Sequence, residues 1–182
     1  MPVDIESFKL GMRRLAAGVC LITTEEVDGA RTGMTATAVC SVSANPPTLL
    51  CCINRNNASY AAISRSGMFA VNVLAIDDRP LADRFASPVS SAEKFALGLW
   101  IHLHTRAPVL ESALVAFDCL VSQTVEAGTH GIVMGEIQAV HVRKAAAQPL
   151  LYAHGAYGGF ESMAAANNIK NFWIPTWDHE PH

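Results

Sequence analysis

The stretch that decides the fold runs from Arg31 to Ser66 and reads RTGMTATAVCSVSANPPTLLCCINRNNASYAAISRS. Its first part, Gly33 to Ser43, is rich in Thr, Ala, Val and Ser, which suit a pleated strand but give a core little bulk. Such a strand could lie against something flat. Asn45-Pro46-Pro47 ends it, because proline supplies no ladder donor, and Thr48 to Ile53 resumes as a short apolar run. The pattern predicts strand, turn, strand.

A helix is expected directly after these strands. Ala58 to Ser64 has helix-forming composition, with Asn56 or Asn57 as the N-cap and a glycine beyond it as the stop. Free backbone N–H groups at that end, joined by Arg55 and the Ser59 hydroxyl, would suit a phosphate. On spacing alone, an ordinary capped helix with a solvated arginine explains the same residues.

The composition describes one domain of 182 residues with a sizeable core. The chain is 51% hydrophobic and only 16% charged, which fits either a buried subunit interface or a dense β core. A formal charge of −3 without a basic run argues against a nucleic-acid partner. No apolar stretch approaches the roughly 20 residues that a bilayer span requires, and the polar N-terminus has no signal-peptide core. We therefore expect a cytoplasmic protein without a membrane partner.

The five cysteines are odd in number, show no C-x-x-C spacing and lie in apolar strand-like runs, at Cys20, Cys40, Cys51, Cys52 and Cys119. This usage is typical of reduced thiols that pack as small core residues. The vicinal pair Cys51-Cys52 would point to opposite faces of a strand. A redox disulfide is therefore weakly supported.

Trp100 to Thr105 alternates apolar residues with histidine, which predicts a strand carrying His102 and His104 on one face. No third metal ligand is placed to join them. A solvated or ligand-facing pair is therefore favoured, and no metal is expected.

The rest of the chain predicts more strands and a few short helices. Asp4 caps a packing helix with Phe8, Met12 and Leu15 on one face, which Gly18 ends. Further strands are expected at Gly18–Glu25, Arg31–Ala38, Met68–Leu74, Ala113–Glu126, Gly131–Arg143 and Leu150–Tyr152, and further helices from Asp77 to about Phe85 and over Ser90–Ala96. His130 stands at the tip of one hairpin. His154 to Phe160 is glycine-rich, which suits either close backbone approach to a ligand or a loose turn.

Six or more strands with few helices favour an antiparallel barrel over a βαβ sheet. No G-x-G-x-x-G occurs, so a nicotinamide cofactor would have to bind without a Rossmann domain.

The combination GMTATAVCSVSANPPTLLCCINRNNASYAAI resembles the flavin reductase family of the short-chain, split-barrel type, the reductase components of two-component flavin-dependent monooxygenases. The resemblance covers most of the chain, through matches in order at Phe8–Met12, Ala17–Val19, Asn72–Leu74, Lys94-Phe95, Ala107–Leu110, Gly128–His130, Pro149–Tyr152 and Tyr157.

The resemblance implies a mainly β, split β-barrel fold with a few short flanking helices. It also implies NAD(P)H-dependent reduction of FMN or FAD, a homodimer with flavin near the interface, and release of reduced flavin to a separate monooxygenase. The resemblance leaves open whether the flavin is FAD or FMN and whether the hydride donor is NADH or NADPH. Hydride transfer needs no nucleophile or acid–base pair, because the two cofactors supply the electronics.

The residues assigned to the flavin ring form one strand and its continuation: Met34, Thr35, Ala36, Thr37 and Ala38. Those assigned to the ribityl chain and phosphate are Asn54, Arg55 and Ser59. By resemblance, Phe85 and Lys94 lie near the phosphate or adenine end, the catalytic candidate His130 lies near the reacting rings, and His154 and Tyr157 lie along the rim. For Phe85, packing in the core is favoured equally with this role at the flavin. For Lys94, a solvated surface charge is favoured equally. The chain departs from the family at Ala156, where many members carry an arginine.

We expect a reductase domain over residues 1–160 and a tail over 161–182. The tail contains Trp173 and Trp177, which suggest docking on the second subunit, whereas a disordered end is the alternative. Three other functions stay open: an oxidoreductase of this fold that retains FMN and acts on a small molecule such as a pyridoxal compound, a flavin- or haem-binding protein without turnover, and a structural subunit of a larger oxygenase.

Overall fold

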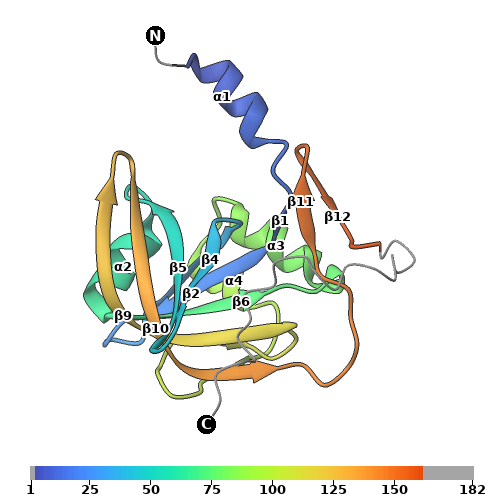
Figure 1. Ribbon diagram of the computed structural model, residues 1–182. Helices are drawn as coiled ribbons and strands as arrows, with labels where there is room; N and C mark the ends of the chain where they lie inside the picture. Colours follow the sequence, from blue (N-terminus) through green and yellow to red (C-terminus); the bar gives the residue numbers. More distant parts are fainter. Residues whose placement is uncertain (1–2, 162–182) are drawn as a thin grey trace, which may run out of the picture.

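The computed structural model describes residues 3–161, which are built around a seven-stranded antiparallel sheet (Figure 1). The strand order is β3-β2-β6-β9-β10-β5-β4. The strands are β2 (Cys20–Glu25), β3 (Arg31–Ala36), β4 (Val39–Ala44), β5 (Pro47–Asn54), β6 (Met68–Val73), β9 (Val115–Ala127) and β10 (His130–Val142).

The two edge strands of this sheet, β3 and β4, are consecutive in the chain. β3 ends at Ala36 and β4 begins at Val39, so the two edges can stand at most about 11 Å apart at that point. A seven-stranded sheet can satisfy this only by curling round until its edges meet, as in a barrel. The prediction of one continuous strand over Gly33–Ser43 was wrong, because the chain changes from one edge to the other at Thr37 and Ala38.

Two small sheets and five helical segments complete the described chain. β1 (Ala17–Gly18), β11 (Leu151–Ala153) and β12 (Ala156–Gly158) form one sheet, and β7 (Trp100–Ile101) pairs with β8 (Val109–Leu110). The helical segments are α1 (Ile5–Met12), α2 (Ala58–Ser66), η1 (Ile76–Asp78), α3 (Arg79–Ala86) and α4 (Ser91–Phe95). The mainly β architecture with short helices is the one expected.

The core consists of two clusters, which meet along β2. Leu21 packs with Leu74, Phe85 and Leu110 in the first cluster, whereas its neighbour Ile22 packs with other residues in the second. This division follows from the pleat, which turns successive side chains to opposite faces. The five cysteines are free thiols, with Cys51 fully buried and Cys52 on the other face of β5, as predicted. The prediction of a core position was wrong for Cys40, which is exposed on the edge strand β4.

Several local predictions are confirmed by the caps and pairings. Asn57 is the N-cap of α2 and accepts a hydrogen bond from the Ser59 N–H, and Gly67 ends the helix with φ 69°. β9 pairs with β10 as the hairpin expected around His130, and the predicted strands β2 and β3 pair in the same antiparallel way. His130 is the first residue of β10, directly after the turn at Gly128 and Thr129.

Other predictions were wrong, for reasons of tertiary structure. The first helix ends at Met12 and buries none of its residues, and Figure 1 shows α1 projecting away from the sheet. The strand predicted over Trp100–Thr105 ends at Ile101, because the His104 and Thr105 N–H groups donate to the buried Asp118 carboxylate, at 2.8 and 2.7 Å. The glycine-rich segment after Tyr152 is a hairpin of β11 and β12.

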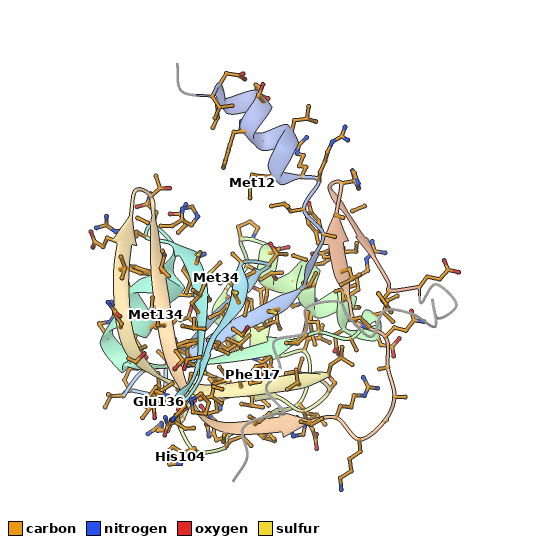
Figure 2. All side chains as sticks on the ribbon, viewed as in Figure 1. Met12, Met34, His104, Phe117, Met134 and Glu136 are labelled. Atoms are coloured by element: carbon orange, nitrogen blue, oxygen red, sulfur yellow. The ribbon has the colours of Figure 1, made fainter. Side chains whose placement is uncertain are left out.

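Three further expectations concern the C-terminal tail, membrane-spanning helices and a metal site. The tail predicted over 161–182 lies, from residue 162 on, outside the described residues. No helix within residues 3–161 is both long enough and apolar enough to span a bilayer. Among the same residues, no group of three or more His, Cys, Asp and Glu side chains could hold a metal ion. His102 instead lies 3.4 Å from Glu25, and Figure 2 places His104 at the opposite end of the molecule from Met12.

Candidate functional site

A pocket of about 380 Å³ lies where the two edges of the sheet meet. Eight of the thirteen predicted site residues line it: Met34, Thr35, Ala36, Thr37, Ala38, Asn54, His130 and Tyr157. The structure adds four residues that the sequence analysis missed: Val19, Cys52, Ala86 and Tyr152.

One wall of the pocket is the end of β3 and the two residues that follow it. Thr35 fixes this wall to α3, because its hydroxyl donates to the Ala82 carbonyl at 2.7 Å. Thr37 and Ala38 belong to neither strand, although the Ala38 carbonyl still accepts from the Cys52 N–H at 3.0 Å. The small side chains of this segment make a wall that a flat ring can approach closely.

The polar end of the pocket is formed by Asn54 and His130, which are directly paired between β5 and β10. The Asn54 side-chain oxygen accepts from the Asn56 N–H at 2.9 Å, which leaves the side-chain amide to meet a ligand. Nδ1 of His130 lies 2.9 Å from the Thr129 hydroxyl. Cys52 lies two residues before Asn54 and so faces the same side of β5. That two-residue period could have identified Cys52 from the sequence.

The rim of the pocket is aromatic. Tyr152 and Tyr157 are opposite each other in the β11–β12 pair, with ring centroids 5.4 Å apart and planes at 67°. Burial, followed by the charge of Asp83, raises the pKa of the Tyr157 phenol. Tyr152 was missed because the alternation of so short a strand gives no signal of which face meets a ligand.

Of the three residues assigned to the ribityl chain and phosphate, Arg55 and Ser59 lie outside the lining of this pocket. Arg55 pairs with Glu126 at 3.0 Å, and the buried Ser59 hydroxyl lies 3.3 Å from that of Thr32. Two N–H groups at the start of α2 already have local acceptors: those of Ser59 and Tyr60 donate to the side-chain and main-chain oxygens of Asn57. The structure therefore shows a capped helix here, with Arg55 in an exposed ion pair.

Three further predicted residues also lie outside the lining. Phe85 is 2% exposed and packs edge-on against Phe95, with ring centroids 5.1 Å apart. Lys94 donates to the Gly33 carbonyl at 3.3 Å, behind the β3 wall, and burial lowers the pKa of its ammonium group. His154 occupies the β11–β12 turn with φ 55°, and its N–H donates to the Arg13 carbonyl at 2.7 Å.

The lining fits a planar, partly polar ligand such as the flavin ring. Its apolar groups come from Val19, Met34 and the small alanines, and its hydrogen-bonding groups lie at the edges. Among the described residues, the lining contains no carboxylate, lysine or arginine. These residues can therefore bind, orient and shield a ligand that brings its own reactivity.

Comparisons with known proteins agree with this geometry. Residues 12–161 match the family model described as "Flavin reductase like domain". The chain is 44% identical over 155 residues to "FMN reductase (NADH) RutF 2" of Methylorubrum extorquens (strain PA1), covering 85% of this chain and 89% of that relative.

Two solved structures are similar over most of their length. "Flavin reductase PheA2 in native state" superposes with a TM-score of 0.77 at 33% identity, covering 88% of this chain and all of that one. BorF, the flavin reductase component of a bacterial two-component tryptophan halogenase, superposes with a TM-score of 0.78 at 27% identity, covering 88% of this chain and all of that one. The family model spans more than three quarters of the chain and the relative is well above 30% identical, so this chain belongs to the flavin reductase family.

Proposed function

We propose that this chain uses NADH or NADPH to reduce FMN or FAD and delivers the reduced flavin to a separate flavin-dependent monooxygenase. The observation that carries the proposal is the pocket at the junction of the sheet edges, which offers a flat wall and polar edges and, within residues 3–161, no carboxylate, lysine or arginine in its lining. The similarity to RutF, an NADH-dependent FMN reductase, favours NADH and FMN. The similarity to BorF, which belongs to a two-component halogenase, supports a partner that consumes the reduced flavin.

When bound, flavin and nicotinamide supply the hydride chemistry, and the residues of this chain hold the two rings together and keep water away. The Met34–Ala38 wall would support the flavin ring, and the Asn54 amide would hydrogen-bond to the polar edge of that ring. Because the Thr129 hydroxyl lies beside Nδ1 of His130, Nε2 is the ring nitrogen that would remain free for the ligand. The pocket is open on one side, as a protein that releases its product requires.

We further propose that Arg55, Ser59, Lys94, Phe85 and His154 act around this centre. Arg55 would exchange its partner Glu126 for a phosphate. Both side chains are exposed, at 41% and 60%, so breaking this ion pair costs little, about 1 kcal/mol or less. Phe85 and Lys94 support the β3 wall from behind.

A homodimer is part of the proposal. α1 exposes the large apolar side chains Ile5, Phe8, Leu10 and Met12, and an apolar groove of about 520 Å³ runs beneath it. Thr37, Ala38 and Tyr152 line both the groove and the pocket, so a second subunit covering α1 would lie beside the flavin site. We also propose that residues 1–160 form the reductase domain and that 161–182 dock on the partner subunit.

The proposed function is tested by following nicotinamide absorbance with each pairing of NADH or NADPH with FMN or FAD. Saturable oxidation that depends on added flavin is expected. His130→Ala should lower kcat/KM by about tenfold or more, the lower range for a positioned catalytic group. His141→Ala is the matched control, because His141 lies on the same strand outside the pocket and should leave kcat/KM within twofold.

Absence of turnover with all four pairs would overturn the proposal. Tightly retained FMN that turns over without added flavin would favour an FMN-retaining oxidoreductase. Bound flavin without nicotinamide oxidation would favour a binding protein.

A further inference from the structure

The hydroxyl of Thr35 is engaged within the protein, although Thr35 lines the pocket. It donates to the main-chain carbonyl of Ala82 in α3 at 2.7 Å. A hydroxyl carries a single proton, so Thr35 has none left to donate to a ligand. The part that Thr35 plays in the site is therefore different from that of a hydrogen-bond donor to the flavin.

The Ala82 carbonyl joins two separate parts of the pocket lining. Thr35 approaches this oxygen from β3, and the helical pattern of α3 assigns the Ala86 N–H, four residues further on, to the same oxygen. Thr35 and Ala86 both line the pocket, whereas Ala82 itself is buried. One carbonyl thus stands at the corner where the β3 wall meets α3.

β3 depends on such contacts because it is an edge strand of the seven-stranded sheet. Its main chain pairs with β2 on one side only, so the ladder alone holds it less firmly than an inner strand. Phe85 packs on Gly33, which lies two residues before Thr35 and so on the same face: a Cβ built on Gly33 would stand 2.8 Å from Cε1 of that ring. Lys94 donates to the Gly33 carbonyl at 3.3 Å. The helices therefore press on β3 at Gly33 and hold it by a hydrogen bond at Thr35.

We propose that Thr35 is a positioning residue, whose hydrogen bond to α3 fixes the width of the flavin pocket. This inference rests on the proposed function for the identity of the ligand. A wall that is held in place before binding lowers the ordering cost of association. The bond supports the flavin before and during the reaction alike, so its loss raises KM and leaves kcat nearly unchanged.

The kinetic test compares two variants of Thr35. Thr35→Val removes the hydroxyl and keeps the shape of the side chain. It should raise the Kd for FMN, measured by titration of FMN fluorescence, and the KM about fivefold, the scale of one hydrogen bond, with kcat within twofold. Thr35→Ser keeps the hydroxyl and should bind FMN within twofold of the wild type.

Thr24→Val is the matched control. The Thr24 hydroxyl also donates to a main-chain carbonyl at 2.7 Å, that of Met68, but Thr24 lies outside the pocket lining. This variant loses the same kind of bond and should keep the Kd for FMN and the KM within twofold. Thermal denaturation checks that every variant is folded at the temperature of the assay.

A second readout needs no ligand. Amide hydrogen exchange reports how often the end of α3 opens. In the absence of flavin, Thr35→Val should speed exchange of the Ala86 and Ser87 amides about fivefold, because the bond that holds this helix to β3 is gone. Loss of a direct contact between Thr35 and the flavin would leave that exchange unchanged.

Unchanged exchange at the end of α3 would overturn the role of the Thr35 bond. Faster exchange with unchanged FMN affinity would overturn the positioning role, as would a Thr35→Ser variant that binds as weakly as Thr35→Val, or an equal loss of affinity in Thr24→Val. A wild-type protein that binds no FMN would overturn the proposed function and this role together, while the exchange would still show separately whether Thr35 holds α3.

Discussion

Gly135 on β10 lies where a side chain has no room. A Cβ built there would stand 2.5 Å from Cζ of Phe69 and 2.8 Å from Cβ of Cys119, both fully buried. We expect Gly135→Ala to lower the free energy of unfolding by about 1–3 kcal/mol, the usual cost of overpacking. Denaturant titration measures it. Gly158→Ala on β12 is the control, because its Cβ would meet nothing within 4 Å; an equal loss there would refute the packing explanation.

Glu25 makes stability depend on acid pH. Its side chain is 4% exposed and accepts from Arg31 at 2.9 Å and Arg106 at 2.6 Å. Burial alone would raise the pKa of this carboxyl, but the hydrogen bonds from Arg106 and Arg31 outweigh burial and lower it. A lowered folded-state pKa gives stability that is complete above the unfolded value, about 4.3, and is lost as the pH falls through the folded value.

Glu25→Gln should therefore lower the free energy of unfolding at neutral pH, by about 1–3 kcal/mol, and flatten its fall below about pH 4. Urea titrations at several pH values measure both effects. Glu6→Gln, at an exposed carboxylate on α1, should keep the wild-type pH profile. If the free energy of unfolding of Glu25→Gln fell at acid pH as steeply as that of the wild type, other groups would be the cause of the fall.

At the scale of elements, the start of α2 is governed by its cap. Asn57 accepts from the Ser59 N–H at 2.9 Å, so Asn57→Ala should cost about 1 kcal/mol of unfolding free energy. Asn56→Ala is the matched control, because Asn56 contributes its main-chain N–H to the local bonds and its side chain to none that the structure describes within residues 3–161. Thermal denaturation compares the two, and equal losses would contradict the cap assignment.

Helix ends and strand faces that depend on residues close together in the chain could be predicted from the sequence. Asn57, Gly67 and the period of two in β5 depend on near neighbours, and the structure agrees with them. The segment at His104 could not be predicted, because its N–H group meets Asp118, fourteen residues away, instead of a ladder partner. Nor could sequence show that α1 would leave its apolar face uncovered within the described part of the chain.

For the site, the sequence identified the residues that share a strand but not those brought in by the curling of the sheet. Met34 to Ala38 form a continuous wall, as predicted. Ala86 and Tyr152 join it only because α3 packs on β3 and because β11 pairs with β1. Arg55 was predicted as a phosphate ligand because it stands where the helix after β5 begins; the structure places it outside the pocket lining, in an ion pair with Glu126.

At the scale of the whole molecule, closure of the sheet creates the site. The edges β3 and β4 are joined by Thr37 and Ala38, and these two residues line both the pocket and the groove beneath α1. Whatever covers α1 therefore also borders the proposed flavin pocket, and Figure 2 shows Met12 on the part of α1 nearest the sheet. Assembly and ligand binding should accordingly be coupled.

Leu10 offers the sharpest test of that coupling. It is 60% exposed on α1 and lines neither the pocket nor the groove, so Leu10→Glu should not disturb the fold of the protomer. Burying one leucine contributes about 1.5–3 kcal/mol, and a two-fold interface contains it twice. We expect the variant to raise the dimer dissociation constant by at least about a hundredfold in sedimentation equilibrium, and to weaken FMN binding in parallel.

Val27→Glu is the matched control, because Val27 is 91% exposed in the turn between β2 and β3, away from α1. It should leave both association and FMN affinity unchanged. A wild-type protein that stays monomeric at high concentration would remove the homodimer from the proposal. A Leu10→Glu variant that is monomeric but binds FMN as the wild type does would keep the dimer and separate it from the flavin site, since the pocket would then be complete within one subunit.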